Sequence, residues 1–178
     1  MLNKINPYIY FMNPDNLNDL PEWDDNEFNH GDNDGEGWKP NPTKDACKAM
    51  YIQWNTVMMV LKAAFDSLKE PGPDDEMTDK EYIDDHVQMI MSDAHVVAVK
   101  IKSFEAGLYT IRMENASIIR KNAQFIKIST NDFMIEGVMA PQHRQIIRDE
   151  IDRFRELFKT WVASFVKDEF EDEWGLFI

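Results

Sequence analysis

Side chains that could bind metal ions are the first candidates for chemistry in this sequence. A helical bundle can hold two metal ions with inward-facing glutamates and Glu-x-x-His motifs. The chain has four histidines, and only His30 has a glutamate three residues before it, Glu27. Because such a centre needs two of these motifs on facing helices, the sequence does not predict a di-metal site.

Two weaker patterns are compatible with a single cation. His30, Asp32 and Asp34 lie in a Gly-rich acidic stretch that is similar to part of a calcium loop, but the acidic first and twelfth positions are missing. A hydrated surface loop is therefore the simpler interpretation. His86 and Asp93 are seven residues apart, so on a helix they would share one face. They are either two ligands of one ion or members of a solvated row beside the core.

Motifs for covalent catalysis or cofactor binding are missing from the sequence. It contains no G-x-S-x-G, phosphate-binding loop or dinucleotide fingerprint. The single cysteine, Cys47, falls on an apolar stripe, which is typical of a small core residue rather than a reactive thiol. We therefore assign no catalytic residue and no cofactor, and we favour a protein that is not an enzyme.

The charge of the chain limits its partners. The net charge is −14, yet residues 100–127 hold six basic and two acidic side chains. A strongly acidic protein repels nucleic acid and anionic membranes, so neither is expected as a direct partner. The basic segment could contact a phosphate backbone, but we favour an arrangement in which it faces the acidic segments of its own chain.

Composition divides the chain into two parts. Residues 1–41 are rich in Asn, Asp, Pro and Gly without helical or strand periodicity, which predicts an irregular N-terminal arm. Residues 42–178 form the predicted helical bundle domain. No apolar run reaches the ~20 residues of a membrane helix, and the N-terminus does not resemble a signal peptide. With only one cysteine, these features favour the cytoplasm.

Helical periodicity predicts a first helix at about 43–69. Asn41 can cap it, Pro42 suits its first position, and Pro71-Gly72-Pro73 ends it. A last helix at about 142–170 opens at Pro141 and carries a stripe of large apolar residues. Opposite charges on its outer face, such as Arg148 with Asp152 and Asp149 with Arg153, are spaced for ion pairs within the helix.

The longest stripe lies between these helices. Thr78 begins a capping-box pattern. Apolar residues then follow at sevenfold spacing: Ile90, Val97, Phe104, Ile111, Ile118 and Phe125. Because the phase does not slip across Gly107, we favour one helix from about 78 to about 128, with a connection at 129–140. A break near Gly107 would instead give a four-helix bundle. The expected fold is thus an all-α antiparallel bundle of three long helices or of four.

Two polar residues interrupt the companion line of the same stripe. Asn115 and Asn122 occupy positions where apolar residues are expected. Buried asparagines can fix the register of a helical assembly, whereas a drifting stripe would leave them half exposed. On these grounds we expect a non-enzymatic bundle that binds another protein or itself, most simply as a homodimer. The alternatives are an acidic mimic of nucleic acid that inhibits a basic partner, and an enzyme or a ligand or metal carrier.

Overall fold

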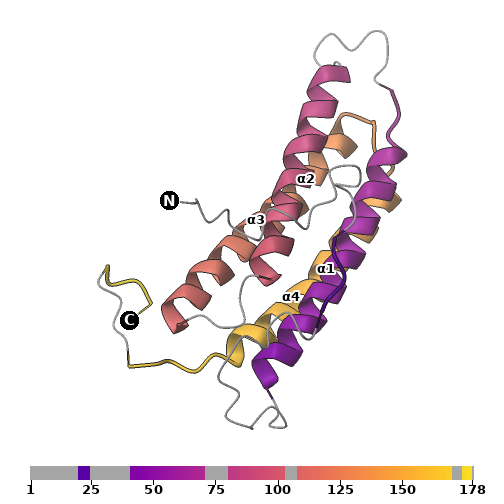
Figure 1. Cartoon of the computed structure of the whole chain (residues 1–178). Helices are drawn as coiled ribbons and strands as arrows, with labels where there is room; N and C mark the ends of the chain where they lie inside the picture. The colour runs from indigo at the N-terminus through magenta and orange to yellow at the C-terminus, as the bar shows by residue number, and fades with distance from the viewer. Residues whose placement is uncertain (1–19, 25–40, 71–79, 103–107, 170–173, 178) are drawn as a thin grey trace, which may run out of the picture.

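The protein is an all-α antiparallel four-helix bundle. The computed structural model describes residues 20–24, 41–70, 80–102, 108–169 and 174–177. Its helices are α1 (Pro42–Asp66), α2 (Lys80–Lys102), α3 (Tyr109–Ile135) and α4 (Pro141–Ala163), and these residues include no strand. Figure 1 shows α1 beside α4 and α2 beside α3, and the contacts α1–α2 and α3–α4 close the ring. Within the described ranges, no helix has the length and apolarity needed to cross a membrane.

The start of α1 follows the sequence signals. The Asn41 side chain accepts a hydrogen bond from the Lys44 N–H at 3.0 Å, and Pro42 takes the first helical position. An asparagine cap satisfies one of the N–H groups that a helix start leaves without partners, and proline has none to satisfy. The predicted beginning of this helix is confirmed. Its end falls at Asp66, slightly before the predicted one.

Trp54 joins three helices at the middle of the core. Its ring centroid lies 4.6 Å from that of Phe154 on α4, and its indole N–H donates to the Ala94 carbonyl of α2 at 2.8 Å. A buried tryptophan needs such a partner because an unsatisfied N–H loses its bond to water. Trp54, Phe154 and Trp161 are all buried in this core. Phe104 lies outside the described residues.

The prediction of one continuous middle helix is wrong, and the alternative with four helices is correct. α2 ends at Lys102, α3 begins at Tyr109, and the two helices pack side by side. The break also changes which face is buried. The buried residues of α3 are Asn115, Ala116, Ile119, Ala123, Ile126, Ser129, Thr130 and Phe133. Ile111 is exposed, whereas Ile118 and Phe125 are half-buried, so the heptad phase is not kept across the break.

The end of α3 also differs from the prediction. The stretch 129–140 was expected to be a connection, but α3 continues to Ile135. Ser129 and Thr130 are buried in the helix because their side chains face the core, and tertiary packing overrides their preference for turns. The helix ends at Ile135 with Glu136 as its C-cap, and the following Gly137 has a φ of +75°, in the left-handed region that glycine adopts without strain.

A residue from beyond α4 caps the start of α3. The Tyr109 N–H donates to the Asp168 carboxylate at 2.8 Å, while the local cap, Leu108, offers no side-chain acceptor. A carboxylate at this position also interacts favourably with the positive end of the helix dipole. α4 itself ends at Ala163, earlier than the predicted residue 170. The segment after α4 thus ties the last helix to the beginning of α3.

Part of the N-terminal region packs on the bundle. Trp23 lies with its ring centroid 5.6 Å from that of Tyr51 on α1, whose hydroxyl donates to the Pro21 carbonyl at 2.6 Å. Lys102 of α2 donates to the Glu22 carbonyl at 3.2 Å. Residues 20–24 therefore contact both α1 and α2. The other residues of the predicted arm, except Asn41, lie outside the described ranges.

Replacing Phe154 by Ala should lower the free energy of unfolding by ~3–5 kcal/mol, because it removes a buried ring and leaves a cavity beside Trp54. Met59→Ala is the control, since Met59 is 65% exposed on α1, and should change stability by less than ~0.5 kcal/mol. Chemical denaturation followed by circular dichroism measures both. Equal losses in the two variants would contradict this account of the core.

Candidate interaction surfaces

The candidate metal ligands do not form a cluster. Among the described residues, no group of three or more His, Cys, Asp or Glu side chains could hold a metal ion. His86 is buried rather than solvated, and its Nε2 lies 4.0 Å from the Asp132 carboxylate of α3. Asp93 is half-buried on α2. His30, Asp32 and Asp34 lie outside the described ranges, so the calcium-loop hypothesis stays untested.

The two asparagines predicted to set register occupy different environments. Asn115 is buried, at 7% exposure, and Asn122 is half-buried. The buried position confirms that α3 carries a polar residue in its core face. Whether either side chain sets the register of an assembly stays a prediction.

His86 shows how α2 and α3 meet. Its ring centroid lies 4.7 Å from that of Phe133 and 5.9 Å from that of Tyr82, and its Nε2 points toward Asp132. Residues spaced by seven return to nearly the same side of a helix. The residues that precede Asp132 at intervals of seven, which are Phe125, Ile118 and Ile111, therefore face α2. The residues that follow Tyr82 at the same interval, Met89 and Val96, face α3.

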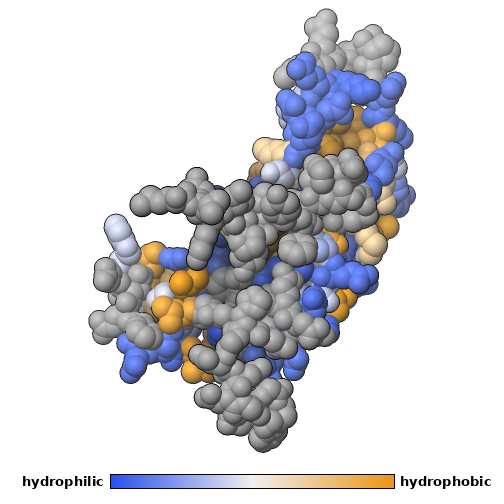
Figure 2. Space-filling model, in the orientation of Figure 1, coloured by the Kyte–Doolittle hydropathy of each residue, from blue (hydrophilic) through white to orange (hydrophobic). Residues whose placement is uncertain are grey.

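These two lines form an apolar surface, which we call the α2–α3 seam. It consists of two heptad-spaced sets of three residues: Tyr82, Met89 and Val96 on α2, and Ile111, Ile118 and Phe125 on α3. Tyr82, Met89, Val96 and Ile111 are between 37% and 47% exposed, and the other two are half-buried. Figure 2 shows one face of the molecule, on which apolar patches interrupt the hydrophilic surface.

The charged residues beside the seam are of both signs. Asp85, Asp93 and Lys100 of α2, and Glu114 and Lys121 of α3, each lie three or four residues from a seam residue on the same helix. Three are acidic and two are basic. The net charge beside the seam is therefore −1, whereas the whole chain has a net charge of −14.

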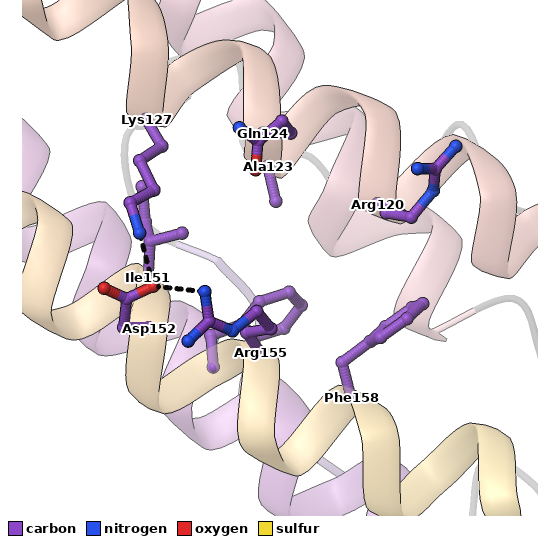
Figure 3. A pocket seen from close by; sticks show the side chains of 9 residues that line it. Arg120, Ala123, Gln124, Lys127, Ile151, Asp152, Arg155 and Phe158 are labelled. Atoms are coloured by element: carbon purple, nitrogen blue, oxygen red, sulfur yellow. Dashed lines mark hydrogen bonds and ion pairs between the residues drawn. The ribbon is translucent and has the colours of Figure 1, made fainter.

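The opposite side of α3 meets α4 in a small groove, which we call the α3–α4 groove. Its walls carry Arg120, Gln124, Lys127, Asp152 and Arg155, as Figure 3 shows, and apolar side chains form its base: Ala123, Ile151, Phe154 and Phe158. The cavity volume is about 60 Å³. Small-molecule sites usually measure ~300–1,000 Å³. The groove can therefore accept one side chain but not a whole cofactor.

Asp152 lies between two cations at this groove. Its carboxylate pairs with Lys127 of α3 and, at 3.0 Å, with Arg155 of its own helix (Figure 3). The hydrogen bond from Lys127 is the main cause that lowers the pKa of Asp152 below its ordinary value of 3.8, and the charges of Lys127, Arg155 and Arg148 add to it. The Lys127–Asp152 ion pair thus joins α3 to α4.

Sequence reasoning missed both surfaces. It placed Ile111, Ile118 and Phe125 in the core, although a second apolar series in the same helix, including Ile119 and Ile126, competes for burial. It also expected Asp152 to pair with Arg148 and Arg153 to pair with Asp149. The structure instead pairs Asp152 with Lys127 and Arg155, and Arg153 with Glu150. The contact with Lys127 becomes visible only in three dimensions, because Lys127 lies on the neighbouring helix α3.

Comparisons with family models, curated proteins and solved structures find no match for this chain.

The Lys127–Asp152 pair predicts a pH dependence. Because the pKa of Asp152 is lowered in the folded state, its contribution to stability is present above its unfolded value of 3.8 and is lost as the pH falls through the folded value. Carbon-detected NMR titration should place the pKa of Asp152 below 3.8, and Lys127→Gln should raise it. Arg153→Gln, which removes a cation bound to Glu150, should leave it unchanged. A Lys127→Gln titration identical to that of the unmodified protein would refute the assigned cause.

Proposed function

We propose that this protein is a non-catalytic helical bundle that acts through protein–protein contact, with the α2–α3 seam as its binding surface and a second copy as the occupant. The observation that carries this proposal is the pair of apolar heptad lines on adjacent antiparallel helices. Four of their six side chains are more than a third exposed. Exposed apolar side chains that lie together on one face of a protein are typical of an interaction site.

The spacing of the seam suits a helical partner. Sevenfold repeats place apolar side chains along one edge of a helix, where the helices of another bundle can insert their own side chains between them. Two α2–α3 pairs brought face to face would bury both sets of lines. In a twofold dimer the same patch from each copy meets itself, so the patch must be self-complementary.

The charges of the seam meet that condition. Two chains of net charge −14 repel one another at long range, so a stable contact must avoid adding like charges. The seam offers Asp85, Asp93 and Glu114 as acids and Lys100 and Lys121 as bases. A second copy brings charges of both signs to the contact, whereas a strongly acidic or strongly basic partner would pair with only one of the two kinds.

The alternative functions have weaker support. An acidic mimic of nucleic acid would need its carboxylates on rigid faces. Here the four helices carry 15 basic and 12 acidic side chains, a net charge of +3, and the other residues carry 4 basic and 21 acidic, a net charge of −17. The α3–α4 groove, at about 60 Å³, is too small for a cofactor or a small-molecule substrate, so this groove does not favour an enzyme or carrier. The cytoplasm, as the proposed location, fits a single cysteine that is buried.

Sedimentation equilibrium tests the proposal directly. The unmodified protein should approach twice its chain mass of 20.9 kDa as its concentration rises through the micromolar range. The double variant Met89→Glu with Ile111→Glu should remain near the mass of one chain, because it places four charges in the paired seams. Both positions are exposed, so the variant should keep its fold, which circular dichroism can check.

The matched control makes the same change elsewhere. Ile52 and Met59 are also exposed and lie seven residues apart on α1, so Ile52→Glu with Met59→Glu introduces the same charge away from the seam. This control should associate like the unmodified protein. A mass that stays near 20.9 kDa for the unmodified protein, or equal disruption by both double variants, would disprove self-association through the seam.

A further inference from the structure

A second binding surface lies on the other side of α3. The α3–α4 groove is lined by three cations, Arg120, Lys127 and Arg155, and by one acid, Asp152. Asp152 pairs with Lys127 and Arg155, which leaves the lining with a net charge of +2. Arg120 is exposed, and within the described part of the chain it contacts no acid. Figure 3 shows Arg120 and Lys127 on the same helix, at opposite ends of the groove.

The base of the groove is apolar. Ala123 supplies the hollow because its side chain is small, and the aromatic rings of Phe154 and Phe158 border it. Phe154 is buried, whereas Phe158 is half-buried and offers part of its ring to the groove. A ligand that enters here therefore contacts guanidinium groups and aromatic carbon together.

The dimensions of the groove restrict the class of ligand. A volume of about 60 Å³ holds a side chain, so the rest of the ligand must lie outside the cavity, as in a peptide or protein. The cations select an anionic group, and arginine favours a carboxylate or phosphate because it can donate two parallel hydrogen bonds. The apolar base adds selectivity for an anion with an apolar neighbour.

The charge of the whole chain decides between the anionic classes. Nucleic acids and anionic membranes present many charges at once, and a protein of net charge −14 repels them before contact. A single carboxylate beside an apolar side chain meets less repulsion and gains the close contacts of the groove. We propose that the α3–α4 groove binds an acidic side chain, next to an aromatic or aliphatic one, on a partner protein. This surface is separate from the α2–α3 seam, so either proposal can fail alone.

Isothermal titration calorimetry with the full chain tests the assignment. The probe is a synthetic peptide in which glutamate alternates with phenylalanine, and its matched control has glutamine in place of every glutamate. The acidic peptide should bind and the amide peptide should not. Arg120→Gln should weaken binding of the acidic peptide about tenfold, since it removes one charge-assisted contact.

Arg153→Gln is the matched protein control. Arg153 is an exposed arginine of α4 that pairs with Glu150 and does not line the groove, so its replacement removes the same charge from the neighbouring helix, outside the groove. It should leave the affinity for the acidic peptide unchanged. Equal weakening by Arg120→Gln and Arg153→Gln would show general electrostatic attraction and overturn the site.

Two further measurements distinguish the proposed partner from other ligands of the groove. Inorganic phosphate or a short single-stranded oligonucleotide that displaces the acidic peptide would reassign the groove to phosphate groups. Absence of binding to the unmodified protein overturns the proposed partner. If binding then appears when Glu171, Asp172 and Glu173 are replaced by amides, the groove belongs to the acidic residues of its own carboxy-terminal region.

Discussion

A helix can bury only one broad stripe of its surface, and this limit governs the structure through α3. The sequence of α3 contains two apolar series, one that includes Ile119 and Ile126 and one that includes Ile118 and Phe125. The first fills the centre of the bundle, where Ile119 and Ile126 are fully buried. The second consequently turns toward α2 and the surface. The apolar seam follows from this competition and from the packing of α2 beside α3.

Local signals predicted the elements better than their spatial relations. The capping residue Asn41 and the prolines at the first helical positions, Pro42 and Pro141, identified the starts of α1 and α4 correctly. Capping and the proline preference depend only on residues that are neighbours in sequence. The unbroken heptad phase across Gly107 predicted one helix, yet the chain forms two. Periodicity records which residues are apolar, and it does not record which of two apolar faces meets the core. Burial of Thr130 in α3 has the same origin.

The charges divide along the same architecture. The helices are slightly basic, and the acidic residues that give the chain its net charge lie mainly between and beyond them. The composition of the sequence indicated a basic segment at 100–127 but could not predict the α3–α4 groove. The walls of that groove come from two helices whose lining residues are about 30 residues apart in sequence. Lys127 and Asp152 meet only once α3 and α4 are antiparallel neighbours. The two sides of α3 thus have different chemistry, apolar toward α2 and basic toward α4.

The bundle, the seam and the groove all depend on the reversal of the chain between α2 and α3. Spin labels at Asp85 and Ile135 in a Cys47→Ser background, diluted with unlabelled protein, measure it by pulsed electron resonance. Both positions are exposed. Antiparallel packing places them near one another, because adjacent helix axes lie ~8–10 Å apart and His86 meets Asp132. We therefore expect a short distance between the two spin labels, set mainly by the lengths of the label side chains. A distance near the ~75 Å that 50 helical residues span would contradict the bundle, the seam and the groove together.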